Sequence, residues 1–228
     1  MNVSPSGWVF LLLMCVWVPL LAVRSALRVR QAASPPTRTQ HVTSVFVSQA
    51  LMLLVALMAA RNDWIELFPR ATPGLLDLAL FVGFLVPTLG SLPGRWNWKP
   101  AEEKRRTLWM LPHSTRDLWW WALVSLVAGV VEEIAYRGVM VTLLQRILGS
   151  WGLAVAICVL VFTLAHYVQG WRALVAIVVF TTAVHWIVRL TGNLYTAMAV
   201  HMVYDFLAGV ILVRLAKRDG LVPTVAGS

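Results

Sequence analysis

Charged residues are scarce in this chain of 228 residues: Asp, Glu, Lys and Arg make up 13% of it, whereas hydrophobic residues make up 59%. A soluble domain carries roughly a quarter charged residues, so this composition excludes an ordinary soluble globular protein. The only cysteines, Cys15 and Cys158, both fall in apolar stretches, which excludes a disulfide framework and a CxxC metal site. Low-complexity tracts, internal repeats and strand-like alternation are also missing, so we expect an all-α fold.

Long apolar stretches are what the chain contains instead. A helix needs about 20 apolar residues to cross a hydrocarbon core roughly 30 Å thick. Spans are predicted at 7–23, 42–60, 74–92, 118–144, 151–169, 172–190 and 193–213. The expected architecture is a polytopic transmembrane helical bundle of about seven spans. The fourth stretch would be ~40 Å long as one helix, so we expect it to tilt, to break near Gly138 or to leave the membrane.

The formal net charge of +9 raises the question of a nucleic-acid partner. The Lys and Arg residues, however, lie between apolar stretches and do not form a basic face. With the N-terminus outside, most of them fall in loops on the inner side, as the positive-inside rule requires. We therefore expect no nucleic acid, and contacts with the headgroups of anionic lipids.

The chain divides into four predicted segments. Residues 1–92 are accessory transmembrane helices, whose three predicted spans are almost free of ionisable groups apart from Asp77, and 93–117 form a basic polar loop that contains Pro100 and the mixed-charge run Glu102–Arg106. Residues 118–215 form the helical bundle that holds most of the intramembrane ionisable side chains, and 216–228 are a basic C-terminal tail. We expect the working part of the protein in the third segment.

Ionisable side chains concentrate in the last four predicted spans. An ionised group at the membrane centre costs about 3 kcal/mol or more, so such residues usually face each other or a hydrated cavity. Glu133 and Arg137 are spaced i, i+4 and can pair on a helix, whereas Glu132 points about 100° away, toward the bundle interior. His201 and Asp205 share the same spacing, which suits common metal ligation or an Asp that orients an imidazole.

Each of these residues also has a structural interpretation. The Glu133 and Arg137 pair can lock a helix, and His166 or His201 alone can be a hydrogen-bonded histidine of the bundle. We interpret His185, which has no acidic neighbour at helical spacing, and Asp77, near a predicted interface, as structural. The joint occurrence of acids and histidines on three of the last four helices favours convergence on a single water molecule.

Three motifs follow one another on successive spans. The order Glu132-Glu133-x-x-x-Arg137, Phe162-x-x-x-His166 and His201-x-x-x-Asp205 resembles the CPBP family of intramembrane peptidases, which includes type II CAAX prenyl endopeptidases and bacteriocin-processing or immunity relatives. The resemblance covers about 118–213. It implies an endopeptidase site within the membrane, in which Glu132 and His166 activate water and His201 and Asp205 support the oxyanion or a metal. It also implies a lipidated or membrane-anchored protein or peptide substrate, and a multi-pass protein of a bacterial inner membrane.

The mechanism and two rival functions stay open. The family is described both as glutamate-type and as metal-dependent, so the candidate cofactor is a divalent metal such as zinc, with Glu132, His166, His201 and Asp205 as candidate ligands. Position 205 is often Asn in such proteins, and an Asp donates to an oxyanion only when protonated, which favours a ligand or histidine-orienting role. One rival function is a transporter or proton-relay protein, which the lack of repeated halves in the sequence disfavours. The other is a non-catalytic immunity or binding member of the family.

Overall fold

The computed structural model describes residues 3–31, 37–69 and 72–221, and every regular element in these ranges is a helix. Helices long and apolar enough to cross a membrane cover Pro5–Arg28, Thr39–Asn62, Leu75–Trp98, Thr115–Leu148, Trp171–Thr191 and Tyr195–Arg218. The apolar helix α9, Trp151–Ala165, is shorter at 15 residues. The all-α, polytopic prediction is confirmed, with six full spans and one short apolar helix among the described residues.

The N-terminal half consists of long helices whose central parts are apolar. The first span joins α1 (Pro5–Leu12), a π-helical turn η1 (Leu13–Trp17) and α2 (Val18–Gln31). Helix α3 (Arg38–Asn62) starts at a capping box, in which the Thr37 and Gln40 side chains satisfy backbone N–H groups of the first turn. Helix α4 is Leu75–Gly90. The apolar side chains of these helices bury against each other or face lipid, and the backbone polar groups pair within each helix.

The segment 93–117 differs from the predicted polar loop, because it contains two short helices, α5 (Leu92–Trp98) and α6 (Ala101–Met110). Proline in the first turn of α5 and acidic residues in the first turn of α6 favour helix starts. The fully buried Trp96 anchors α5 by donating from Nε1 to Asp219 Oδ2 at 2.8 Å. Contacts with the end of α11 stabilise these helical turns.

The fourth span is one continuous helix. It runs through α7 (Thr115–Glu132), a π-helical segment η2 (Glu133–Met140) and α8 (Val141–Leu148). Its 34 residues would extend ~50 Å, more than the hydrocarbon core. Of the three expected alternatives, tilting, a break near Gly138 or an exit from the membrane, the break does not occur, because the helix continues through Gly138. The helix ends at Gly149, whose φ of 66° is the left-handed conformation that favours glycine.

The remaining helices complete the bundle. After α9 comes a short 3₁₀ turn, η3 (Tyr167–Gln169), followed by α10 (Trp171–Thr191) and α11 (Tyr195–Arg218). Of the predicted C-terminal tail, residues 222–228 lie outside the described part of the chain.

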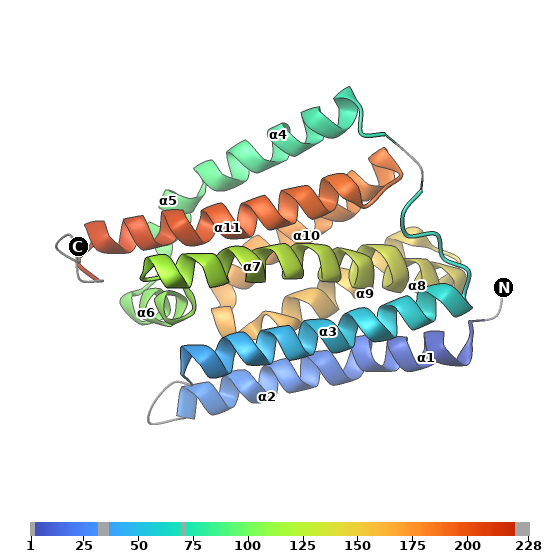
Figure 1. The fold of residues 1–228 in the computed structure, drawn as a ribbon, viewed down its shortest axis with the longest axis horizontal. Coiled ribbons are helices and arrows are strands. Elements are labelled where there is room, and N and C mark those ends of the chain that lie inside the picture. Colours follow the sequence, from blue (N-terminus) through green and yellow to red (C-terminus); the bar gives the residue numbers. More distant parts are fainter. Residues whose placement is uncertain (1–2, 32–36, 70–71, 222–228) are drawn as a thin grey trace.

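Helices distant in sequence lie side by side in the bundle. In Figure 1, α4, α11, α7 and α3 follow one another across the view, with α1 and α2 beyond α3 and with α8, α9 and α10 behind. Helix α7 therefore packs between α11 of the C-terminal half and α3 of the N-terminal half. This arrangement decides which side chains can reach the acidic residues at the end of α7.

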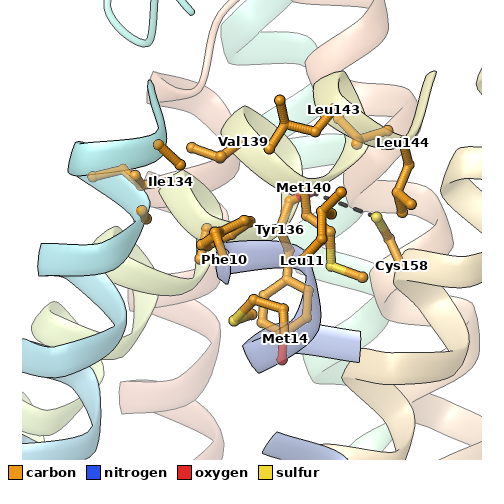
Figure 2. Close-up of a cluster of buried hydrophobic side chains, with 14 of the residues drawn as sticks. Phe10, Leu11, Met14, Ile134, Tyr136, Val139, Met140, Leu143, Leu144 and Cys158 are labelled. Carbon is orange, nitrogen blue, oxygen red and sulfur yellow. Dashed lines mark hydrogen bonds between the residues drawn. The ribbon is translucent and has the colours of Figure 1, made fainter. Parts of the chain in front are cut away.

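The largest apolar cluster lies around η2. Figure 2 shows Phe10, Leu11 and Met14 of the first span beside Tyr136 and Met140 of η2. The dashed line marks the contact of Cys158 Sγ with the Tyr136 carbonyl oxygen at 3.8 Å. One face of η2 is thus fixed by apolar packing, and the acidic and basic residues of the same segment are held on its other face.

Candidate active site

Glu133, the first residue of η2, is the centre of a buried ionic cluster. Its Oε1 accepts a hydrogen bond from Arg137 at 3.1 Å and lies 2.8 Å from Nδ1 of His201. The Glu133 side chain has no exposed surface, and His201 is 4% exposed. The predicted i, i+4 pair of Glu133 and Arg137 is therefore present, and it also holds the histidine of α11.

Arg137 has contacts on two further helices. Its guanidinium donates to Thr181 Oγ1 on α10 at 2.5 Å and lies over the ring of Phe162 on α9, 4.8 Å from the centroid. A buried guanidinium needs such partners because it cannot lose its proton. Arg137 thereby connects η2, α9 and α10 at the level of the cluster.

Glu132, the last residue of α7, lies beside this cluster and differs from its neighbour in its partners. Its Oε1 accepts a hydrogen bond from Gln49 Nε2 on α3 at 2.7 Å. Its Oε2 lies 3.9 Å from His201 Nε2 and has no hydrogen-bond partner among the described residues. Glu132 is thus fixed at one oxygen and available at the other.

His201 connects the three carboxylates. Its Nδ1 faces Glu133, whereas its Nε2 faces both Glu132 Oε2 and Asp205 Oδ2, the latter at 3.4 Å. The Asp205 side chain is 32% exposed, so it forms the more open edge of the cluster. The predicted spacing of His201 and Asp205 on one face of a helix is confirmed.

His166 lies next to the cluster without joining it directly. It follows α9, its Nδ1 lies 2.8 Å from the Phe162 carbonyl oxygen, and its ring stacks on Phe162 at 4.5 Å. A carbonyl only accepts, so Nδ1 carries the proton and Nε2 of the neutral ring is an acceptor. No hydrogen bond joins His166 to a described acidic side chain, and Phe162 links it to His201, whose ring is 6.2 Å from that of Phe162.

Two glycines allow the close approach of α7 and α11 that forms the site. A Cβ at Gly129 would lie 2.8 Å from the backbone nitrogen of Met202, and one at Gly209 would lie 2.9 Å from Cζ2 of Trp121. Trp121 also donates from Nε1 to the carbonyl oxygen of Asp205 at 3.1 Å. These contacts set the position of α11 along α7, and so bring His201 opposite the end of α7.

The two residues interpreted as structural are not part of the described cluster of carboxylates. Asp77 accepts from the backbone N–H of Gly74 and from Thr196 Oγ1, which ties the start of α4 to α11. His185 is buried on α10.

Gln49 and Thr181 were missed by the sequence interpretation. The available signal for Gln49 was an uncharged polar residue inside an apolar span, a type that often hydrogen-bonds across helices in membranes.

The candidate metal ligands do not form a common site. Among the described residues, no group of three His, Cys, Asp or Glu side chains is arranged to hold a metal ion. His166 lies beyond Phe162, and Nδ1 of His201 is occupied by Glu133. The arrangement of side chains therefore does not bring the predicted ligand set together at one point.

A cavity lies on the same helix interface as Glu132. Its volume is about 480 Å³, and it is bounded by α3, the end of α6 and the first half of α7, including Phe46, Val47, Trp120 and Val124. Val124 precedes Glu132 by about two helical turns, or ~12 Å along α7. The cavity is therefore separate from the cluster but lies between the same two helices, α3 and α7.

These features define a polytopic membrane protein with a buried cluster of carboxylates and a histidine between α7, η2 and α11. Residues 114–207 match the family model described as Type II CAAX prenyl endopeptidase Rce1-like, which confirms the resemblance over this segment. The matched segment starts at the N-cap of α7 and contains all the predicted site residues, and it points to a membrane protease. No curated protein and no solved structure matches the chain.

Proposed function

We propose that this protein is an intramembrane endopeptidase that hydrolyses a peptide bond of a lipidated or membrane-anchored protein or peptide. The observation that carries the proposal is the buried arrangement of Glu132, His201 and Asp205 beside the Glu133 and Arg137 pair. The family match over 114–207 supports a protease of the CAAX type. The matching family and the apolar helices fit a multi-pass membrane protein, for which we propose a bacterial inner membrane.

Glu132 is the proposed general base. Oε2 of Glu133, like Oε2 of Glu132, has no hydrogen-bond partner among the described residues, but Glu133 is unsuited to this role because it is fully buried and its charge is neutralised by Arg137. Glu132 is fixed through Oε1 and has Oε2 available for a water molecule. A positioned carboxylate that accepts a proton in the transition state typically contributes 10²- to 10⁴-fold to the rate.

The proposed reaction needs only water and the peptide. Glu132 takes a proton from water while the water oxygen bonds to the carbonyl carbon, whose π electrons move to the carbonyl oxygen. His201 is held at Nδ1 by Glu133, which only accepts, so its Nε2 is the candidate donor to this oxyanion when the ring is the doubly protonated imidazolium. When the C–N bond breaks, the proton passes from Glu132 to the leaving nitrogen. The products are a carboxylate and an amine.

The other predicted residues act through these groups in this proposal. Arg137 neutralises Glu133, and Glu133 in turn fixes the ring of His201 through Nδ1. Dependence on a divalent metal such as zinc stays a prediction, and it is tested by metal analysis of the purified protein and by cleavage assays with and without a chelator.

The test is cleavage by the full chain reconstituted in phosphatidylethanolamine and phosphatidylglycerol vesicles. The probes are a farnesylated CAAX-type peptide and a panel of peptides with an apolar membrane anchor, each with a fluorophore and quencher. We expect Glu132→Gln to lower kcat by at least ~10²-fold and His166→Ala to lower it as well. Glu102→Gln, which changes an exposed carboxylate on α6, is the matched control and keeps wild-type activity.

Retention of the wild-type rate in Glu132→Gln would exclude the proposed mechanism. If the wild type cleaves none of the peptides but carries protons across vesicles in a manner that depends on Glu132, the transporter function replaces the peptidase. If neither cleavage nor transport occurs, and the Glu132→Gln variant has the same biological effect as the wild type, a binding or immunity role explains the protein better.

A further inference from the structure

Gln49 lies on α3, in the half of the chain outside the matched segment 114–207. It is 7% exposed, and its side chain reaches across the bundle to Glu132 at 2.7 Å. Burying an amide in a membrane span without a partner is unfavourable, and this hydrogen bond satisfies one N–H of the amide group. The amide oxygen, Oε1, has no hydrogen-bond partner among the described residues.

The orientation of the Gln49 amide follows from the chemistry of its partner. An ionised carboxylate only accepts hydrogen bonds, so Nε2 of Gln49 faces Glu132 and Oε1 is directed elsewhere. Glu132 Oε2 is a second buried acceptor without a partner in the described part of the chain. Gln49 Oε1 and Glu132 Oε2 thus belong to two side chains that are hydrogen-bonded to each other, through Gln49 Nε2 and Glu132 Oε1.

Water is the small molecule that suits two neighbouring buried acceptors, because it has two O–H donors. Buried polar atoms almost always have a hydrogen-bond partner, and a buried water typically makes two to four such bonds. A water that donates one hydrogen to Glu132 Oε2 and the other to Gln49 Oε1 has both lone pairs directed away from these acceptors. That is the orientation a nucleophile needs.

We infer that Gln49 is a positioning residue that fixes the Glu132 carboxylate and, together with it, orients the attacking water. This inference rests on the proposed peptidase function and extends it, since the site then needs a side chain from the N-terminal half. In the proposed step, the O–H bond directed at Glu132 breaks and its proton moves to Oε2. The hydrogen directed at Gln49 stays on the oxygen that bonds to the carbonyl carbon.

Helix α3 is held where this role requires it. Ala56, Ala59 and Ala60 of α3 are buried in the same apolar cluster as Ile134 and Ala135 of η2, and the small alanine side chains let the helices approach closely. Gln49 lies about two turns from Ala56 on the same helix. The contact between Gln49 and Glu132 is therefore supported by packing on one side of the pair.

The first experiment separates the effects of Gln49 on kcat and on KM. Gln49→Leu keeps the side-chain volume approximately and removes both polar atoms. With the peptide that the wild type cleaves, we expect kcat to fall 10- to 100-fold and KM to change less than threefold, because misplacing a reacting group costs rate and not substrate affinity. Gln145→Leu, the same change at an exposed position of α8, is the matched control and keeps both constants.

The second experiment does not depend on activity. Thermal unfolding midpoints in detergent are compared for the wild type, Gln49→Leu, Glu132→Leu and the double variant. Each single change leaves a buried partner unpaired, so we expect the double variant to lose less in Tm than the sum of the two singles. This coupling measures the contact itself.

The outcomes distinguish the inference from the function on which it rests. If the wild type cleaves and Glu132→Gln does not, but Gln49→Leu keeps the wild-type kcat, the inference is overturned and the peptidase function stands. If the Tm losses are additive, the contact is overturned whatever the activity. If the wild type cleaves nothing, the peptidase function fails, and with it the role of Gln49 in orienting water, while the Tm coupling still reports the contact.

Discussion

Two adjacent carboxylates at the end of α7 differ in their partners and in their exposure. Glu133 is bound at Oε1 by Arg137 and His201 and has no exposed surface, whereas Glu132 is bound at Oε1 by Gln49 of α3 and its side chain is 13% exposed. In both residues Oε2 has no hydrogen-bond partner among the described residues. The charge of Glu133 is neutralised by Arg137, which suits a structural role, whereas Glu132 is bound by a neutral amide and keeps its charge available to act on water. The division of roles between neighbours follows from their directions around the helix.

Arg137 gives a test of the structural role at the scale of one residue. Arg137→Met keeps much of the apolar stem but leaves Glu133 without its guanidinium partner in a fully buried position. Removing one partner of a buried ion pair typically costs ~3 to 5 kcal/mol, so we expect a clear loss of stability. The measurement is the thermal midpoint in detergent. Arg106→Met, at the exposed pair with Glu102, is the control and should change stability by less than about 1 kcal/mol; equal losses in both variants would contradict the prediction.

Asp219 gives a pH-dependent test outside the spans. Hydrogen bonds from Trp96 and Lys104 lower the pKa of the Asp219 carboxyl from its ordinary 3.8 to about 2. Because the folded pKa is the lower one, the carboxylate contributes stability above about pH 4, and that contribution is lost as the pH falls from 4 toward 2. We expect wild type and Asp219→Asn to differ in Tm at pH 5 and to converge near pH 2. A difference that does not change over this range would show that the carboxylate contributes nothing through ionisation.

At this scale the sequence predicted the residues better than their contacts. The i, i+4 spacing was sufficient for the Glu133 and Arg137 pair and for His201 and Asp205, since both lie within single helices. It was insufficient for Gln49, because the contact with Glu132 joins positions 83 residues apart. The separation of His166 from the acidic residues by Phe162 likewise depends on how α9 packs, which spacing within a motif does not contain.

Among the helices, the long fourth span consists of two α-helical segments with a π-helical segment between them. A π-helical segment contains an extra residue relative to α-helical winding, and such segments frequently occur at functional sites. Here η2 carries Glu133 and Arg137 on one face and Tyr136 and Met140 on the apolar face. The sequence predicted the excess length and gave a break near Gly138 as one of three ways to accommodate it, because hydropathy does not distinguish a π segment from a kink. Gly138 instead allows the Leu67 side chain to pack close to the helix.

The approach of α7 to α11 is tested by adding one methyl group. Gly129→Ala places a Cβ against the backbone of Met202, so the helices must separate, at a cost of ~1 to 3 kcal/mol. We expect a lower Tm and lower cleavage activity, because His201 moves away from Glu132. Gly83→Ala, on α4 where a Cβ meets nothing within 4 Å, is the matched control and should be neutral or slightly stabilising. Unchanged stability and activity in Gly129→Ala would show that the glycine is not required for the close contact.

For the whole molecule, the order of helices in space was beyond the sequence pattern. Hydropathy predicts where a span begins and ends to within a few residues, and six full spans and one shorter helix agree with that. It does not state which spans are neighbours, because lipid-facing and protein-facing apolar surfaces are chemically similar. The N-terminal helices were expected to be accessory scaffold, yet α3 packs directly along α7 and supplies Gln49 to Glu132 (Figure 1).

The cavity between α3 and α7 indicates how a membrane-anchored substrate would approach the site. Its wall includes Phe46, Val47, Trp120 and Val124, so it suits the apolar anchor of such a substrate better than a hydrated chain. Val124→Phe narrows the cavity about two turns from Glu132 without touching the cluster. We expect KM for the cleaved peptide to rise about tenfold, with kcat within threefold of wild type, since the change removes binding and not a group that reacts.

The control for this prediction is Val179→Phe, at an exposed position of α10 on a lipid-facing surface. It adds the same volume away from the cavity and should leave both constants unchanged. If Val124→Phe lowers kcat and leaves KM unchanged, the cavity does not hold the substrate anchor, and the substrate reaches Glu132 from the more open side of the cluster near Asp205. Whether Val124→Phe changes KM or kcat therefore distinguishes a substrate that approaches along α3 and α7 from one that approaches along α11.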